Sequence, residues 1–397
     1  MLLYKIPKKG KLMYLITNFL KQGKDNKVAI KQLQALLIFL GESISVDGDF
    51  GPITTKAVKR FQEKNSLTID GMIGEQSWIK LYSLAKEYAQ NLNSQNSNIK
   101  DISIESKDSI LILWLSSILY LIDNNTKVSS IFNKELEATI LKLQAQKGYQ
   151  ESGFVDKEIW DDIFESSRVE IDSVYSMLLI NEYIDKKAVE NGLAPASVKA
   201  VIKVESSGRG FYFDKKPTIL FEGHKFWEQL ILKGFDPKEL EEKNRDILYR
   251  YWTKKYYSRN SQKEYHRLDK AIKIDEESAL KSASWGMFQI MGFNHKSAGF
   301  DTVYEFVEYI KVSEKNQLDA FFTFLKKGGC FKHLKNKNWA EFARCYNGSA
   351  FKKNGYDAKL QKAYFKSKDI AGEEQIMDEI TTLYASKLQE AFSSYIK

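Results

Sequence analysis

The sequence predicts a mainly α-helical protein, in which two copies of a small helical module precede a larger α-rich domain. Residues 28–82 align with residues 110–164 at a fixed shift and without a gap. In the second half, Val198, Val201 and Ile202 recur at helical spacing. Asp-Gly pairs in the first copy indicate tight turns between helices. At 397 residues the chain is long enough for two or three domains.

The repeat retains its apolar pattern and several specific residues. The identical pairs include Leu33 with Leu115, Gln62 with Gln144, Gly71 with Gly153, and Trp78 with Trp160. An ungapped match of this length is hard to obtain by chance. We therefore predict one small helical module in two copies.

The first copy contains the turn sequence from Val46 to Pro52 and a tryptophan that should pack back onto the helices. It resembles the peptidoglycan-binding domain of cell-wall hydrolases, and this resemblance implies a three-helix module. On that basis the candidate wall-binding residues are Asp47, Asp49, Phe50 and Trp78.

The second copy departs from this pattern at its first turn. Asp47-Gly-Asp49 is replaced by Ser129-Ser-Ile131, and Gly51-Pro52 is replaced by Asn133-Lys134. We expect a retained core but altered turn chemistry. The second copy could bind glycan, act as a spacer or serve as a structural partner of the first.

Glu205 is the most informative residue of the second half. It follows Val201 by four positions and Ile202 by three, so it falls on the apolar stripe of a helix. Burial of a carboxyl group raises its pKa, which suits a general acid. Residues 206–208, Ser-Ser-Gly, should end the helix and leave the carboxyl at its mouth. The alternative is a glutamate at a frayed helix end or paired with lysine.

Three further stretches carry isolated polar groups. Glu222 ends a β-branched run that begins at Pro217, and Gln289 lies among apolar residues between Gly286 and Gly292. The third stretch ends in Tyr-Asn-Gly at 346–348. Taken singly, these would be a surface carboxylate on a hairpin, a satisfied core amide and a helix stop.

Together, Glu-Ser, Ser-x-x-Gly-x-x-Gln and Tyr-Asn-Gly in this order resemble the lysozyme superfamily. Residues 204–211, 220–224, 284–292 and 346–348 resemble the N-acetylmuramidase domain of modular phage endolysins, over roughly residues 175–367. The resemblance implies an α-rich, lysozyme-like domain with a short β-hairpin. It also implies that Glu205 is the catalytic acid and that Gln289, Tyr346 and Asn347 line the substrate groove.

A second carboxylate would stabilise the developing cation or activate water. Glu222 is the candidate, and Asp214 competes because it also follows the catalytic helix closely. Trp285 and Phe211 are candidate groove aromatics, although most aromatic side chains of this half should be core.

The expected function is hydrolysis of the bond between N-acetylmuramic acid and N-acetylglucosamine during host-cell lysis. A lytic transglycosylase would use the same glutamate and give anhydro-muramic ends. A non-catalytic wall-binding or virion protein, and a toxin delivered into competing bacteria, are further alternatives.

The net charge of +8 suits an acidic cell envelope, although the charges are spread along the chain. No nucleic-acid motif is present. The four histidines show no metal-ligand spacing, so we expect no metal and no cofactor. Cys330 and Cys345 are predicted to remain thiols, and neither has the context of a peptidase nucleophile. We expect a monomer whose partner is peptidoglycan.

The predicted segments are a basic N-terminal segment (1–25), the first module (26–90), a polar linker (91–105), the second module (106–168) and the catalytic domain (175–397). The apolar run 110–122 is too short to cross a membrane and should be a core helix. No signal peptide is expected. The endolysin resemblance then implies that the protein passes from the host cytoplasm to the periplasm and cell wall through a separate holin. The basic and aromatic insert at 235–280 could be a lid, a membrane-active segment or simple packing.

Overall fold

The computed structural model describes residues 19–23, 26–93, 99–205, 210–212, 214–258, 261–348, 351–352 and 355–368. The chain divides into two compact units, which are described separately below. Unit 1 comprises residues 1–178 with 213–215, and unit 2 comprises residues 179–212 with 216–397.

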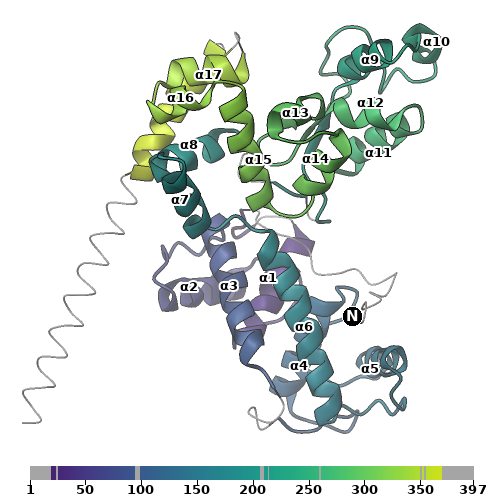
Figure 1. Ribbon diagram of the computed structural model, residues 1–397. Coiled ribbons are helices and arrows are strands. Elements are labelled where there is room, and N and C mark those ends of the chain that lie inside the picture. Colours follow the sequence, from purple (N-terminus) through teal and green to yellow (C-terminus); the bar gives the residue numbers. More distant parts are fainter. Residues whose placement is uncertain are drawn as a thin grey trace, which may run out of the picture. The chain divides into compact units, whose positions relative to one another are not determined.

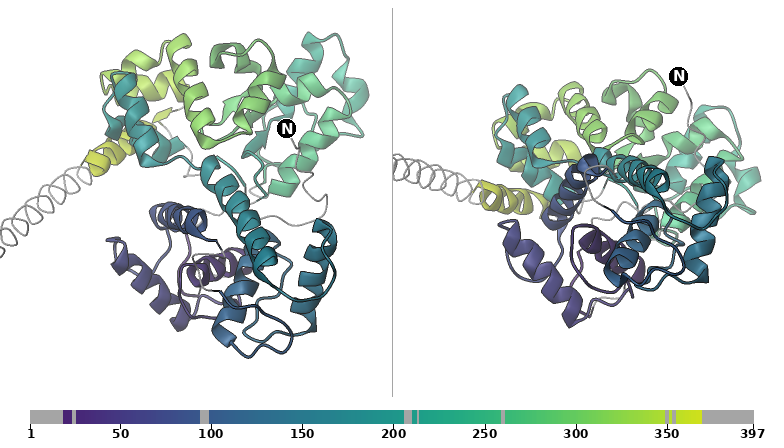
Figure 2. Two further views of the ribbon diagram at one scale, coloured as in Figure 1. Left: turned by 60° about the horizontal axis from the view of Figure 1, so that its bottom comes forward. Right: turned by 90° about the horizontal axis from the view of Figure 1, so that it is seen from below.

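The described residues of unit 1 form six helices that follow the sequence repeat (Figures 1 and 2). They are α1 (Lys27–Phe39), α2 (Pro52–Lys64), α3 (Glu75–Asn91), α4 (Ser109–Ile122), α5 (Lys134–Lys147) and α6 (Lys157–Met177). Each helix of the second copy begins 82 residues after its counterpart, as in 27 and 109, or 75 and 157. The isolated β-bridges Leu20–Ile73 and Ile102–Val155 keep the same spacing. Residues near 20 and 102 therefore complete each module.

The turn before the third helix is held in the same way in both copies. Gln62 Oε1 accepts a hydrogen bond from the Gly71 amide at 2.9 Å, and its Nε2 donates to the Met72 carbonyl at 2.8 Å. Gln144 bonds the Gly153 amide and the Phe154 carbonyl, each at 2.9 Å. Each glutamine thus satisfies buried backbone groups of the turn.

The first turn differs between the copies, as its sequence predicted. In copy one, Gln34 Oε1 accepts from the Gly48 amide at 2.9 Å. In copy two, Ser116 occupies the place of Gln34, and its hydroxyl donates to the Ser129 carbonyl at 2.8 Å. Asn133 then caps α5 by accepting from the Leu136 amide. The hydrogen bond between Gln34 and Gly48 in copy one is therefore replaced in copy two by the bond between Ser116 and Ser129, and Asn133 adds a helix cap.

The two copies pack directly on each other, α1 against α4 and α3 against α6. Trp114 of α4 stacks on Phe39 of α1 with ring centroids 6.5 Å apart and donates to the Phe39 carbonyl. The apolar run 110–122 is therefore a packed helix, and Leu115 and Ile118 are fully buried. Across the described residues, no helix is long and apolar enough to cross a membrane.

The described part of unit 2 consists of short helices around a small sheet (Figure 1). Its first half contains α7 (Asn181–Glu190), α8 (Pro195–Glu205), β1 (Ile219–Phe221), α9 (Gly223–Leu232), α10 (Pro237–Glu241), α11 (Ser261–Ile272) and α12 (Glu276–Lys281). Then follow β2 (Ala283–Trp285), β3 (Ile290–Met291), η1 (Gly292–Asn294), α13 (His295–Ala298), α14 (Val303–Ile310), α15 (Glu314–Lys327), α16 (Phe331–Lys335) and α17 (Trp339–Asn347), and residues 356–368 are also helical.

The sheet of unit 2 is antiparallel with the order β1-β2-β3. Strands β2 and β3 form a hairpin, and β1 adds a third strand from the β-branched run before Glu222. Leu220 pairs with Ser284, and Ser284 pairs with Met291 on its other side. The sheet therefore brings residues near 220 beside residues 283–291.

Cys330 and Cys345 form a disulfide, with Cα atoms 5.6 Å apart. The prediction of two thiols was wrong, because α16 and α17 pack together and bring cysteines 15 positions apart into bonding range. The disulfide joins the start of α16 to the last turn of α17, which carries Tyr346 and Asn347.

Candidate active site

The helix predicted to carry the catalytic acid is α8, and it ends at Glu205. Val198 and Val201 are buried on its inner face, as the sequence predicted. The side chain of Glu205 and residues 206–209 lie outside the described residues. The predicted rise in the pKa of Glu205 therefore stays a prediction.

The chain that follows α8 is anchored by two side chains of α15. Glu314 Oε1 accepts from the Gly210 amide at 2.9 Å, and its Oε2 accepts from the Leu179 amide at 3.0 Å. Gln317 Nε2 donates to the Gly210 carbonyl at 3.2 Å. Both backbone polar groups of Gly210 are thus satisfied by one helix, at the first described residue after Glu205.

Gln317 also holds the turn between β2 and β3. Its Oε1 accepts from the Met287 amide at 2.7 Å. Gly286, in the same turn, has φ +70°, and a Cβ there would lie 2.7 Å from the Gln317 side chain. Only glycine fits this close approach. Gln317 therefore fixes the segment after α8 against the turn that carries Gln289.

Sequence reasoning missed Glu314 and Gln317. Both lie on the face of α15 that carries Leu318, Phe321 and Leu325, and all five are buried. Polar residues on the apolar stripe of a helix are the same signal that identified Glu205. The sequence therefore contained the signal that would have identified Glu314 and Gln317.

Gln289 lies at the end of the β2–β3 turn and is exposed, so it is not a core amide. Its backbone has φ +49°, a left-handed conformation that costs energy for a residue other than glycine. Gln289 Oε1 accepts from the Ser284 hydroxyl at 2.7 Å, and its Nε2 donates to the Gly286 carbonyl at 2.9 Å. These two hydrogen bonds fix the orientation of the Gln289 side chain.

Tyr346 supports the same turn from α17. Its hydroxyl donates to the Phe288 carbonyl at 2.6 Å, and its ring stacks on Phe342 with centroids 5.8 Å apart. Asn347 is the last residue of α17 and is half-buried. The structure thus joins Tyr346 to the residue before Gln289, and the role of Tyr346 and Asn347 in a substrate groove stays a prediction.

Glu222 is the N-cap residue of α9, directly after β1, and its side chain is 16% exposed. Its Oε2 accepts a short hydrogen bond from the Tyr257 hydroxyl and lies 3.3 Å from His224 Nδ1. Burial lowers the pKa of His224, against the opposing charge of Glu222. Burial and the bond to Glu222 raise the pKa of Tyr257, so this hydroxyl remains a donor.

Asp214, the competing carboxylate, lies in an exposed turn. The segment 213–215 groups with unit 1, whereas Glu222 belongs to the same unit as α8.

Trp285 and Phe211 were candidates for an open groove, but both are core residues. Trp285 is 2% exposed and donates through Nε1 to the Leu280 carbonyl, and Phe211 is 4% exposed. Strand β2 has buried side chains throughout, so Trp285 points into packed protein. Both side chains are therefore part of the core of unit 2 and do not line an open groove.

Two of the four candidate wall-binding residues are also core, because Phe50 and Trp78 are fully buried. Asp47 Oδ1 accepts from Gln34 Nε2 and from the Asp49 amide, each at 2.8 Å. Burial would raise the pKa of Asp47, but these hydrogen bonds outweigh it and lower the pKa. Asp47 thus organises the turn and leaves Asp49 exposed.

The first copy contains a hollow of about 380 Å³ that was not predicted from the sequence. It is lined by apolar and aromatic side chains, among them Leu37, Phe61 and Tyr88, with Glu42 and Lys64 beside them. A hollow that mixes aromatic faces with charged groups can hold a sugar or peptide.

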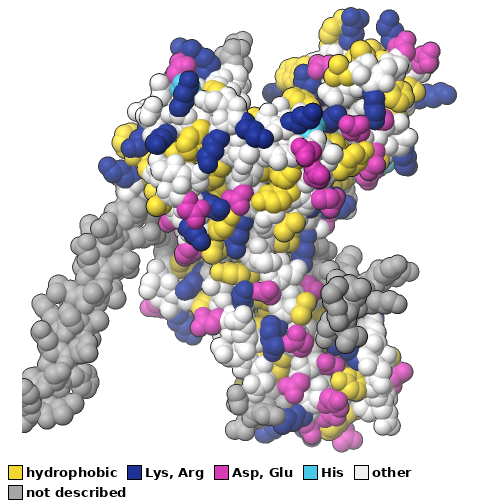
Figure 3. Space-filling view, viewed as in Figure 1, with side chains coloured by type: hydrophobic (Ala, Val, Ile, Leu, Met, Phe, Trp, Pro, Cys, Tyr) yellow, Lys and Arg dark blue, Asp and Glu magenta, His cyan; other side chains and the backbone are white. Residues whose placement is uncertain are grey.

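The charged side chains are spread over the surface, in agreement with their spread along the sequence. On the face in Figure 3, Lys and Arg side chains are interspersed with Asp and Glu over both units. Among the described residues, no group of three or more His, Cys, Asp or Glu side chains could hold a metal ion.

Comparison with known proteins gives two domain matches. The family model "Muramidase: N-acetylmuramidase" matches residues 194–368, and "Putative peptidoglycan binding domain" matches residues 26–81. The zinc D-Ala-D-Ala carboxypeptidase of Streptomyces albus G is 32% identical over 83 residues. That match covers 20% of this chain and 32% of the relative, so the chain spans about a third of its length.

Among solved structures, the crystal structure of the Burkholderia AP3 phage endolysin matches 89% of this chain and 100% of its own, with 26% identity and a TM-score of 0.48. The two domain matches fall on the first helical module and on the region that contains α8, the sheet and α17. Residues 194–368 therefore belong to the N-acetylmuramidase family, preceded at 26–81 by a peptidoglycan-binding domain.

Proposed function

We propose that the chain is a peptidoglycan hydrolase that cleaves the glycosidic bond between N-acetylmuramic acid and N-acetylglucosamine. One observation carries the proposal: the N-acetylmuramidase match spans α8, the sheet and α17, and α8 ends at Glu205. In this proposal Glu205 is the general acid that protonates the leaving oxygen.

Glu222 is the proposed second carboxylate. It lies just after β1 and is held through Oε2 by Tyr257, which leaves Oε1 to act on water or on the developing cation. The Tyr257 hydroxyl fixes the orientation of the carboxylate without neutralising it, since burial keeps this tyrosine protonated.

Gln289, Tyr346 and Asn347 are the proposed substrate-binding residues. Gln289 is exposed in a strained turn, and strain that the surrounding contacts maintain is often found at binding sites. The Gln289 side-chain carbonyl would accept from a sugar hydroxyl, the Asn347 amide would donate to a sugar oxygen, and Tyr346 holds the turn.

Unit 1 is the proposed wall anchor. Copy one would bind peptidoglycan, and copy two would support it through the packing of α1 on α4 and of α3 on α6. The proposed route is that of an endolysin: a monomer made in the host cytoplasm that reaches the periplasm and cell wall through a separate holin. The basic charge would favour its approach to an acidic envelope.

The test is mass spectrometry of soluble fragments from purified peptidoglycan, with Glu205→Gln in parallel. Hydrolysis gives reducing-end muramic acid, and the variant should release less than a few per cent of the wild-type fragments. Glu182→Gln, on an exposed glutamate of α7, is the matched control and should retain wild-type release.

Anhydro-muramic ends would replace the hydrolase with a lytic transglycosylase. If the wild type releases no glycan fragment but binds the wall, the proposal fails in favour of a binding or virion protein. Substantial release by Glu205→Gln would refute the role of Glu205.

A further inference from the structure

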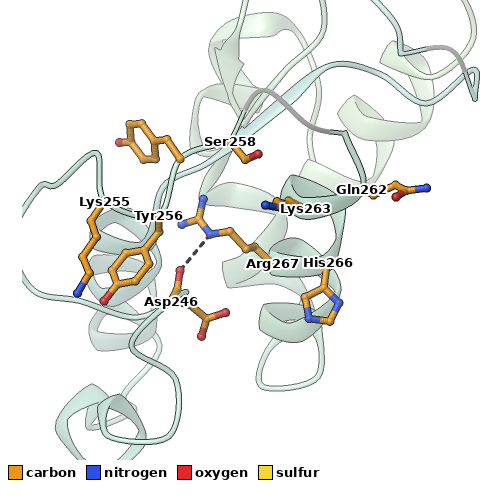
Figure 4. A pocket seen from close by; sticks show the side chains of 9 residues that line it. Asp246, Lys255, Tyr256, Ser258, Gln262, Lys263, His266 and Arg267 are labelled. Carbon is orange, nitrogen blue, oxygen red and sulfur yellow. Dashed lines mark hydrogen bonds between the residues drawn. The ribbon is translucent and has the colours of Figure 1, made fainter. Parts of the chain in front are cut away.

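A cavity of about 560 Å³ lies in unit 2 between α11 and the segment that follows Asp246 (Figure 4). Lys255 and Tyr256 line one side in Figure 4, and Gln262 and His266 line the opposite side. We call it the Lys255–Lys263 cavity. Its size suits a ligand of a few amino-acid or sugar residues.

The floor of the cavity is a buried ion pair. Arg267, only 5% exposed, contacts Glu264 at 3.1 Å and donates through Nε to the Asp246 carbonyl at 3.0 Å. The Glu264 carboxylate also accepts from the Ser258 amide at 2.7 Å and the Phe221 amide at 3.1 Å. Because these groups satisfy one another, the floor is rigid and its charge is balanced.

The rim carries net positive charge. Lys255 and Lys263 are both exposed and line the cavity. Asp246 is the one acidic side chain among the described lining residues, and its carboxylate pairs with Lys270. The two lysines therefore give the opening an attraction for anions.

The walls are partly aromatic. Lys255 lies over the Tyr256 ring, 5.2 Å from its centroid, and Tyr256 stacks on Tyr249 at 5.4 Å. Aromatic faces beside ammonium groups suit a ligand that combines apolar side chains with carboxylates. A peptide with free carboxylates has this combination, whereas a bare glycan lacks the charge.

The cavity is connected to the proposed catalytic carboxylate. Tyr257 lines the cavity, and its hydroxyl donates to Glu222 Oε2. The Phe221 amide, one residue before Glu222, bonds the Glu264 carboxylate of the floor. A ligand here would lie one side chain away from Glu222.

We propose that the Lys255–Lys263 cavity binds the carboxylate-bearing peptide stem of the muramic acid beside the scissile bond. This inference rests on the proposed function, because it assumes that Glu222 acts on a muramyl residue. It also assigns a role to the 235–280 insert, which supplies Asp246, Lys255 and Tyr257. A peptide stem is favoured over a wall or lipid phosphate because the site is a pocket joined to Glu222, and peptidoglycan carries the stem on the sugar next to the bond.

The test is a binding titration of the full-length protein with a free stem tripeptide, followed by heteronuclear NMR or calorimetry. Lys255→Met/Lys263→Met removes both charges and retains much of the side-chain length. Its Kd should rise about tenfold, because each charge pair in a half-open site contributes roughly three- to fivefold. Lys273→Met, on an exposed lysine in the turn directly after α11, is the matched control and should leave Kd unchanged.

Unchanged tripeptide binding by the double variant would overturn the proposal. Inorganic phosphate, titrated in parallel, tests the other source of anions, and phosphate that binds as tightly and displaces the tripeptide would also overturn it. Fragment release by the wild type, measured separately, reports on the proposed function. Tripeptide binding without release would retain the subsite and reject the hydrolase.

Discussion

Replacement of Gln317 by leucine is the sharpest test of how this domain is assembled. The side chain is 1% exposed and bonds three backbone groups from three segments. It accepts from the Met287 amide at 2.7 Å and donates to the carbonyls of Gly210 at 3.2 Å and Ile310 at 3.1 Å. Leucine has a similar volume but can satisfy none of them.

The cost follows from these three lost partners. A buried backbone group without a partner costs about 1–3 kcal/mol, and the added apolar burial of leucine returns about 1–2 kcal/mol. We therefore expect the free energy of unfolding to fall by about 3 kcal/mol. This corresponds to a roughly 150-fold change in the folding equilibrium and, for a unit of this size, to a fall in Tm of about 6–12 °C.

The assay is urea unfolding followed by tryptophan fluorescence, with fragment release from peptidoglycan measured below the unfolding transition. Gln361→Leu, at an exposed position of the helix 356–368, is the matched control and should change stability by less than about 0.5 kcal/mol. We expect Gln317→Leu to lose activity even where it is folded, because the segment after α8 and the Gln289 turn share this anchor. A loss of stability below about 1 kcal/mol would show that water or a neighbour replaces the amide, and would refute the reasoning.

Three further predictions concern unit 2. Replacing Cys330 and Cys345 by serine should cost about 3 kcal/mol of stability, since the disulfide closes a loop of 15 residues, and dithiothreitol should destabilise the wild type but leave the variant unaffected. Tyr257→Phe should lower kcat for glycan cleavage at least tenfold by removing the charge-assisted hydrogen bond to Glu222, and an unchanged pH–rate profile and kcat would contradict this role. The pKa of His224 is lowered in the folded protein, so its contribution to stability is present above its unfolded pKa of about 6.5 and is lost as pH falls through the folded value. His224→Asn should therefore lose less stability than the wild type between pH 7 and pH 5 in urea titrations, and parallel losses would rule this out.

Much of unit 1 could be predicted from the sequence because its signals are local. Helix starts lie at Pro52 and at asparagine or aspartate caps, and apolar residues recur within each helix. The pairing of Gln62 with Gln144 identified the residues that hold equivalent turns. Caps, turns and periodicity act over a few residues, so they can be read without knowledge of the tertiary structure.

The sequence was less informative about which aromatic side chains face a ligand. Trp285, Phe50 and Trp78 all suit a sugar-binding surface by residue type, yet all are buried. A large aromatic side chain stabilises a core as readily as a binding site. The choice depends on which elements cover it, and the residues themselves do not encode that locally.

By itself, then, the sequence determined the mainly helical fold, the spacing of the two modules and the position of Glu205 at the end of α8. Only the tertiary structure decided that Cys330 bonds Cys345, and that Gln317 joins Gly210 to the Gln289 turn across more than 100 residues of sequence. The reason is physical. A helix depends on contacts between residues a few positions apart, whereas these links require distant segments to meet, and that meeting is set by the packing of the whole unit.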